Sequence, residues 1–200
     1  MGRVLALGEK MDDFAANLTK TVAPAGQQWE YNSIDTHVIG MISRGATERS
    51  ITELMSEKII SKLGQERAPY YVTDVVGVAF VLGGLNITTR DYARFGQMIL
   101  QNGQWNGQQI VPADWIAQST CASAKITAGE FGYGYQWWVP VGAEKGQEFM
   151  AHGIYGQYIY IDKTAGVVIV STGADRTFRD DGVINQNIKM FRQIATADKE

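Results

Sequence analysis

The amino-acid sequence predicts an α+β fold, in which an antiparallel sheet is flanked by helices. Aromatic and β-branched residues fill positions 148–162 and 167–173 on either side of a short Lys-Thr-Ala-Gly break, which is the pattern of two antiparallel strands joined by a turn. Apolar residues recur at helical spacing both before and after these strands. With 200 residues, 45% of them hydrophobic and 20% charged, the chain can bury a core as one domain.

Composition narrows the classes of function. The formal net charge is −3, and the sequence holds neither a basic run nor a basic stripe, which argues against nucleic acid and anionic membranes as partners. No stretch approaches the ~18 consecutive apolar residues of a membrane span, and no signal-peptide apolar region is present near the start. Cys121 is the single cysteine, so an intrachain disulfide is excluded and the localisation stays unknown.

Three helices are predicted in the first third of the chain. Residues from Val4 to Leu18 show helical spacing with no capping residue before them, so the chain is expected to start inside a longer protein. The alternative is an amphipathic helix that begins at residue three as a natural start. A second helix begins at Ser33, the expected N-cap, with Asp35 in its first turn. A third runs from about Ser50 to Gly64, with Ser50 and Glu53 as a capping box.

Further elements follow in order. Residues 65–87 are expected to be mostly irregular, and a helix from Arg90 to Gln101 ends at Asn102-Gly103. Asn106-Gly107 predicts a tight turn, Pro112 opens a short helix, and the Gly- and aromatic-rich run 131–138 enters a strand. The last helix is predicted from about Asp180 to Ala195.

Two glycines in the strand pattern of 148–162 suggest a functional site. Gly153 and Gly156 would each weaken strand pairing, so they indicate a bulge or a place where a ligand approaches the backbone. We therefore expect this strand to form one wall of an active site.

Five segments stand out by their order and spacing: Trp29–Thr36, Gly83–Gly96, Gly107–Pro112, Tyr133–Trp138 and His152–Gln157. Together they resemble the serine hydrolases of the class C β-lactamase and penicillin-binding-protein superfamily, nearest to its esterase and 6-aminohexanoate-dimer hydrolase branch. The resemblance implies a β-lactamase/transpeptidase-like fold with an α-helical subdomain, from which the N-terminal part is missing. Residues 1–200 are then expected to be the C-terminal portion of one catalytic domain.

That family uses three motifs, and two of them have counterparts here. Tyr31-Asn32-Ser33 resembles the Tyr-x-Asn or Tyr-x-Ser motif, which implies that Tyr31 is the general base. The strand motif implies that the backbone N–H of Ile154 is an oxyanion donor. Ala151 stands where the family often has a cation, with His152 one place later, and this departure favours ester or amide substrates over β-lactams.

The first motif, Ser-x-x-Lys, is absent. None of the serines is followed by a lysine three residues on; they are Ser33, Ser43, Ser50, Ser56, Ser61, Ser119, Ser123 and Ser171. Tyrosine has an ordinary pKa of about 10, and a neighbouring ammonium is needed to make it a base near neutral pH. Without that lysine Tyr31 is expected to keep its proton, and without the serine nothing can be acylated. The chain alone is therefore expected to be inactive, which leaves its status as an enzyme uncertain.

Each candidate also has a structural interpretation. Ser33 serves equally well as a helix cap or as a substrate contact, and His152 on a strand is more often a packing residue than an acid–base group. Tyr133, Trp137, Trp138, Gly153 and Tyr155 are the candidate substrate-binding residues, although the aromatic ones are individually more typical of a core.

Other residues are expected to be structural. Asp91 and Arg94 fit helix-terminus or ion-pair roles, and Cys121 has no histidine nearby in the pattern to make a cysteine hydrolase. His37 has no cluster of further ligands at metal spacing, so neither a metal nor another cofactor is expected.

The function implied by the resemblance is hydrolysis of a small-molecule ester or amide by the complete protein. The alternatives are a non-catalytic fragment or pseudoenzyme that binds a ligand or a complementary N-terminal piece, and a β-lactamase. A missing portion would leave core surface exposed, which predicts a homodimer or association through that surface.

Overall fold

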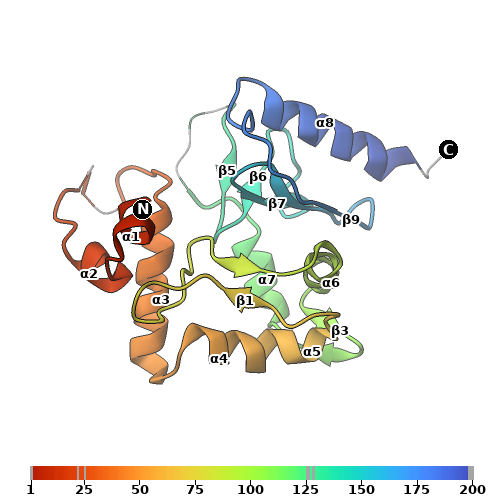
Figure 1. Ribbon diagram of the computed structural model, residues 1–200. Coiled ribbons are helices and arrows are strands. Elements are labelled where there is room, and N and C mark those ends of the chain that lie inside the picture. Colours follow the sequence, from red (N-terminus) through yellow and green to blue (C-terminus); the bar gives the residue numbers. More distant parts are fainter. Residues whose placement is uncertain (1, 22, 25, 125–126, 128, 198–200) are drawn as a thin grey trace. The chain divides into compact units, whose positions relative to one another are not determined.

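The computed structural model describes residues 2–21, 23–24, 26–124, 127 and 129–197, and the chain divides into two compact units, residues 1–88 and 89–200. Figure 1 shows the elements of each unit. Met1, the residue before the predicted helix without a capping residue, lies outside the described residues. Among the described residues, no helix combines the length and the apolar character needed to cross a membrane.

The first unit begins with two short helices where the sequence predicts one. α1 covers Gly2–Leu7 and α2 covers Met11–Ala16. The prediction of one helix is wrong because Gly8 adopts a left-handed φ of 66° and Lys10 is extended, which ends one helix before the next begins. Val4 and Met11 are buried, and together with Phe80 they form a core cluster.

Helix α3 spans Ser33–Thr47, with Asp35 in its first turn as predicted. Ser33 is not the N-cap, which corrects the prediction: Asn32 takes that place with an extended backbone and no side-chain cap bond. Gly40 lies so close to Val81 that an added Cβ would approach its Cγ2 to 2.9 Å, so this side of α3 packs tightly.

The third predicted helix is confirmed as a run of three consecutive pieces. α4 (Ile51–Met55), the π-helix η1 (Ser56–Ile60) and α5 (Ser61–Leu63) follow one another and end at a left-handed Gly64. The Ser50–Glu53 capping box is formed as predicted. The irregular stretch after it contains only the short strands β1 (Tyr70–Tyr71) and β2 (Leu85–Asn86), which pair with each other.

The second unit is built on a five-stranded antiparallel sheet in the order β5-β6-β7-β8-β9. The strands are β5 (Gly132–Tyr133), β6 (Trp138–Val139), β7 (Glu148–Gly153), β8 (Gln157–Asp162) and β9 (Val167–Ser171). Its helices are α6 (Thr89–Leu100), α7 (Ala113–Ser119) and α8 (Val183–Thr196), and β3 (Gln104–Trp105) pairs with β4 (Gln108–Gln109) through the predicted Asn-Gly turn.

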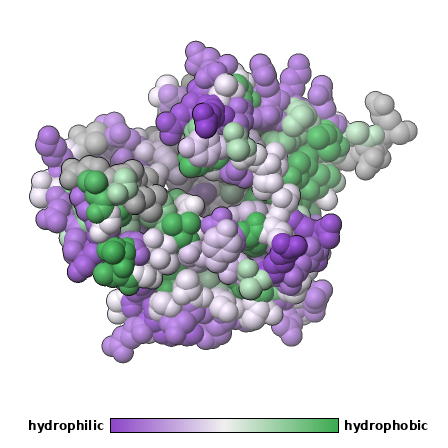
Figure 2. Space-filling view, viewed as in Figure 1, coloured by the Kyte–Doolittle hydropathy of each residue, from purple (hydrophilic) through white to green (hydrophobic). Residues whose placement is uncertain are grey.

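One face of this sheet is covered by α8 (Figure 1). Alternate residues of a strand point to the same side of a sheet, so every second residue can pack against this helix. Met150, Tyr158 and Tyr160 cluster there with Ile188 and Phe191 of α8. Figure 2 shows hydrophobic residues, in green, at the surface over α8, on which Met190 and Ile194 are 45% and 50% exposed.

The other face is covered by α6. An added Cβ on Gly96 of α6 would lie 2.6 Å from Cγ1 of Val168 and 3.0 Å from Cγ2 of Ile159, so helix and sheet approach more closely than any side chain allows. Helices on both faces of an antiparallel sheet confirm the predicted α+β class.

The single strand predicted over 148–162 is wrong. The segment forms a hairpin, in which β7 pairs with β8 from Glu148–Asp162 to Gly153–Gln157. Gly153 ends β7, and Gly156 lies in the turn with a φ of 78°. The unpaired positions 154–156 therefore form a turn at one end of the sheet.

Candidate active site

The turn between β7 and β8 carries the predicted oxyanion donor. Ile154 and Tyr155 are 57% and 46% exposed, and both lie outside the paired register of the hairpin. Tyr155 adopts a left-handed φ of 62°, which is unfavourable for a bulky side chain. Ile154 is thus at an exposed turn rather than within a strand, which corrects the predicted setting of its backbone amide.

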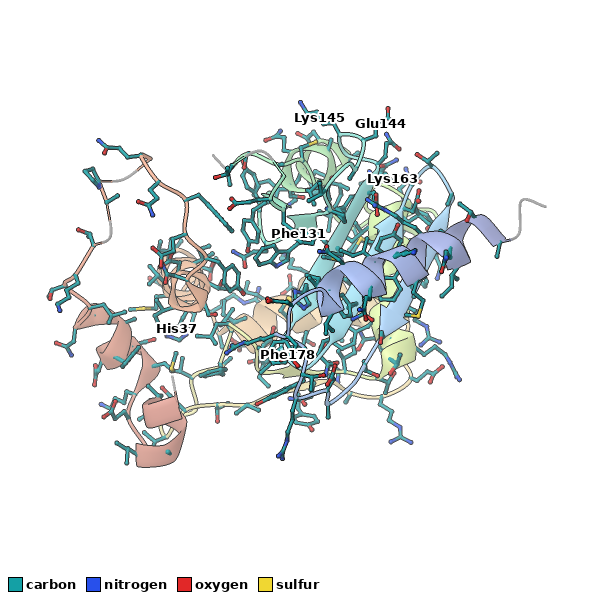
Figure 3. The ribbon with its side chains drawn as sticks, turned by 90° about the horizontal axis from the view of Figure 1, so that it is seen from above. His37, Phe131, Glu144, Lys145, Lys163 and Phe178 are labelled. Atoms are coloured by element: carbon teal, nitrogen blue, oxygen red, sulfur yellow. The ribbon has the colours of Figure 1, made fainter. Side chains whose placement is uncertain are left out.

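The segment after β9 holds this turn in place. The backbone N–H of Asp175 donates to the Tyr155 carbonyl at 3.1 Å, and the Gln157 side-chain amide donates to the Gly173 carbonyl. The ring of Phe178, labelled in Figure 3, meets that of Tyr155 edge-on with centroids 5.4 Å apart. These contacts fix a strained turn from one side.

Sequence reasoning missed these supporting residues. Asp175 accepts hydrogen bonds from the hydroxyl and the backbone N–H of Thr177, which lower the pKa of its carboxyl. An Asp two residues before a Thr after a strand is a turn signal that could have identified the segment, but nothing in the sequence shows that it returns to residue 155.

His152 lies on the α8 face at the base of the turn. Its imidazole stacks on Tyr158 with centroids 4.7 Å apart and meets Trp138 edge-on at 6.3 Å. Burial lowers the pKa of His152, and its Nε2 is buried with no hydrogen-bond partner. A neutral, stacked imidazole of this kind favours the packing interpretation over acid–base chemistry.

The predicted substrate-binding residues differ in burial: the residues before β7 are buried or half-buried, and those at the β7–β8 turn are exposed. Tyr133 and Trp137 are each 8% exposed, and Trp137 packs against Phe149 on the sheet at a centroid distance of 5.2 Å. Trp138 is half-buried and meets Tyr133 edge-on. Only Gly153 and Tyr155 of this set lie exposed beside Ile154, so the structure brings these three together at the turn.

The first unit carries the other predicted site residues. Tyr31 is 45% exposed in the extended segment directly before α3, and Ser33 is the first residue of that helix. The exposed Tyr31 therefore lies two residues before the N-terminal end of a helix of 15 residues.

A polar network ties α2 to α3 one turn further along. His37 (Figure 3) is fully buried, and its Nε2 lies 2.8 Å from Asp12, which also takes two hydrogen bonds from Arg44. Burial raises the pKa of Asp12, but the bonds from Arg44 and His37 outweigh it and hold that pKa below its usual value. His37 is thus engaged in a hydrogen bond with Asp12, and among the described residues no group of three or more His, Cys, Asp or Glu is placed to hold a metal.

Asp91 and Arg94 lie in α6 and form an ion pair, one of the two structural roles predicted for them. Asp91 is fully buried, so a paired guanidinium is what its charge requires.

Comparison with known proteins decides the family. The family model described as beta-lactamase matches residues 5–188. The chain belongs to the beta-lactamase family. Within it, the chain is 29% identical over 152 residues to a 6-aminohexanoate-dimer hydrolase from Paenarthrobacter ureafaciens, covering 72% of this chain and 38% of that protein. The predicted superfamily and branch resemblance is confirmed.

Solved structures agree with this assignment. One described as "Putative 6-aminohexanoate-dimer hydrolase from Bacillus anthracis" is 34% identical, with a TM-score of 0.83 over 95% of this chain and 49% of that one. A penicillin-binding protein from Bacillus halodurans shares the fold at 12% identity, with a TM-score of 0.67 over 92% of this chain and 63% of that one. The beta-lactamase-family chain thus spans half or less of the length of its 6-aminohexanoate-dimer hydrolase relatives.

Proposed function

We propose that this chain is the C-terminal portion of a single serine-hydrolase domain that cleaves ester or amide bonds through a seryl-acyl intermediate. The observation that carries the proposal is the half-exposed Tyr31 directly before α3, in a chain that the beta-lactamase family model matches almost throughout. The Tyr-x-Ser spacing of residues 31–33 matches the base motif of the family.

The proposed reaction divides its roles among Tyr31, the backbone N–H of Ile154 and a serine nucleophile that this sequence does not contain. The phenol oxygen of Tyr31, deprotonated beside the motif lysine, accepts the proton of the serine hydroxyl as that oxygen attacks the carbonyl carbon. The Ile154 N–H donates to the oxyanion that forms, a contribution worth about 10²–10³ in rate for one such donor. Tyr31 then passes the proton to the leaving group, and water hydrolyses the acyl-enzyme.

The substrate to test first is inferred from the relatives of this chain. The name of the Paenarthrobacter ureafaciens relative makes the linear amide of 6-aminohexanoate dimer the first substrate to assay. Tyr155 and Gly153, exposed beside Ile154, would contact the substrate, with Ser33 contributing from the start of α3.

The chain lacks Ser-x-x-Lys, so its isolated form is proposed to be inactive. The test compares the chain alone with the chain linked to the part of the Bacillus anthracis homologue that it does not match. Both proteins are treated with a fluorophosphonate and assayed with p-nitrophenyl esters and 6-aminohexanoate dimer. We expect no labelling of the chain alone, and labelling and turnover in the linked protein that Tyr31→Phe abolishes.

Two results would overturn the proposal. Covalent labelling of the chain alone would place a nucleophile within these 200 residues. A folded linked protein that is neither labelled nor active would favour the second candidate, a non-catalytic binding fragment, for which the missing nucleophile motif already argues. Turnover of nitrocefin in preference to esters and amides would instead identify a β-lactamase.

A further inference from the structure

A groove with a volume of about 440 Å³ runs along one side of α8. Helix positions from Asn185 to Thr196 that recur three and four residues apart form one wall, and Pro140 and Val141, which directly follow β6, form the other. At 1.5 Å per residue, the helical wall is about 16 Å long. Sites for small organic ligands have volumes of about 300–1,000 Å³, so this groove is large enough to hold one.

The floor of the groove is apolar. Ile188 is 4% exposed and belongs to the core cluster that joins α8 to the sheet, and Pro140 is buried as well. Val141 at the rim is 46% exposed, so apolar area remains open above a packed floor. A ligand that covers these three residues removes apolar surface from water, which favours a ligand with an apolar body.

Arg192 lines the groove and is held in place by three hydrogen bonds. Its Nε and Nη2 donate to the two carboxylate oxygens of Glu148 at 2.8 Å each, and Nη2 also donates to the Val141 carbonyl at 3.0 Å. Among the described residues, nothing accepts a hydrogen bond from Nη1. A guanidinium fixed in this way offers a ligand a donor whose orientation is already set.

Lys189 gives the groove its net charge. It is exposed on α8, and within the described part of the chain no carboxylate pairs with it. None of the described residues that line the groove is acidic, and the charge of Arg192 is already balanced by Glu148. The groove therefore complements a single negative charge.

We propose that this groove binds a small organic carboxylate with an apolar body. The carboxylate lies between the Lys189 ammonium and Nη1 of Arg192, and the apolar body covers Ile188, Pro140 and Val141. An amine or a zwitterion is disfavoured, because an ammonium that leaves water for this groove finds no acidic partner there.

The groove lies apart from the candidate active site. Glu148, which holds Arg192, is the first residue of β7, whereas Ile154 follows Gly153 at the other end of that strand. The six residues of β7 separate these two ends by about 17 Å. The proposal thus goes beyond the proposed function, and no readout below depends on hydrolysis.

The experiment titrates the chain with octanoate and follows amide NMR shifts and heat of binding. We expect saturable shifts at residue 141 and within residues 185–196, with a millimolar or tighter dissociation constant. Octylammonium, which has the same apolar chain and the opposite charge, should not bind. The zwitterion 8-aminooctanoate should bind at least about fivefold more weakly than octanoate, because its ammonium loses water without gaining a partner.

Variants of Lys189 test the charge without disturbing the core. Lys189→Gln should raise the dissociation constant of octanoate at least about fivefold, and Lys189→Arg, which keeps the charge, should leave it unchanged. Lys62→Gln makes the same change of charge on α5, outside the groove, and is the matched control that should bind octanoate normally. Equal melting temperatures establish that all of these variants are folded.

Every contrary result overturns the inference. Absence of saturable octanoate binding removes the site outright. Equal binding of octanoate and octylammonium shows that the groove recognises apolar surface alone, and unchanged binding by Lys189→Gln removes the charge argument. Shifts that avoid α8 place the ligand elsewhere. Broadening of the groove resonances with protein concentration, in the absence of any ligand, identifies a second copy of the chain as the occupant.

Discussion

The imidazole of His152 stacks almost parallel on the phenol ring of Tyr158, at an interplanar angle of 10°, and the two residues are directly opposed across β7 and β8. This pair closes the hairpin one step before its last pair and the exposed turn at Ile154. Cross-strand aromatic pairs stabilise a sheet locally, so the stack supports the geometry of the turn. We therefore expect His152 to affect the free energy of unfolding more than any proton-transfer step.

The pH dependence of folding tests this role. Burial lowers the pKa of His152, so the unfolded chain binds its proton at a higher pH than the folded chain does. This contribution to stability is fully present above the unfolded pKa of about 6.5 and is lost as the pH falls through the lower folded value. Urea unfolding from pH 8 to pH 5 should show a fall that His152→Phe, which keeps the stack and cannot titrate, makes shallower. An unchanged pH profile in this variant would contradict the assignment.

The left-handed Tyr155 predicts an unusual ranking of substitutions. Its φ of 62° costs about 1 kcal/mol for a residue with a Cβ and nothing for glycine. Tyr155→Ala loses the contact with Phe178 and keeps the strain, whereas Tyr155→Gly loses both. Urea unfolding should therefore find Tyr155→Gly at least as stable as Tyr155→Ala. If Tyr155→Gly is less stable by about the usual 1 kcal/mol entropy penalty of glycine, the turn is not strained in solution.

Much of the fold could be predicted because local signals agreed with the structure. The Ser50–Glu53 capping box, the Asn106-Gly107 turn and the apolar spacing of α6 each specify a local conformation that packing did not override. The error at 148–162 has a physical cause. Aromatic and β-branched residues continue on both sides of Gly153–Gly156. The chain reverses there through left-handed backbone at both Tyr155 and Gly156, and a tyrosine gives no sequence signal for that conformation.

The candidate site could be predicted only where a motif is local. Residues 31–33 and 152–156 are short patterns beside regular elements, and in the structure Tyr31 and residues 153–155 are exposed. Sequence reasoning missed the contacts that Asp175 and Phe178 make with Tyr155 and that Gln157 makes with Gly173. These contacts depend on the path of the chain after β9, which no local pattern specifies. Burial of Trp137 and Tyr133 depends likewise on which face of the sheet α6 and α8 cover.

Removing Arg192 should destabilise the second unit. Glu148 of β7 accepts from Nε and Nη2 of Arg192 at 2.8 Å each and from the Tyr160 hydroxyl at 2.9 Å. Burial first, and the neighbouring Glu148 second, raise the pKa of Tyr160, so this hydroxyl keeps its proton and remains a donor. Arg192→Met leaves the carboxylate without its cation and should cost about 2–3 kcal/mol, below the full penalty for a buried pair because Arg192 is 42% exposed.

The double variant Glu148→Gln/Arg192→Met supplies the control for this network. It removes both charges, so it should be more stable in urea than Arg192→Met alone. If the two changes add independently, the ion pair contributes nothing to the attachment of α8 to the sheet.

The close approach of α6 to the sheet gives a matched pair of glycine substitutions. Gly96→Ala would push a methyl group to 2.6 Å from Cγ1 of Val168, so α6 must shift and the free energy of unfolding should fall by about 1–3 kcal/mol. Gly45→Ala adds the same methyl group within α3, where nothing lies within 4 Å, and should stabilise the chain by about 0.5–1 kcal/mol through helix propensity. Urea unfolding of both variants should thus give changes of opposite sign. Two changes of the same sign would show that α6 does not lie against β8 and β9 as closely as Gly96 requires.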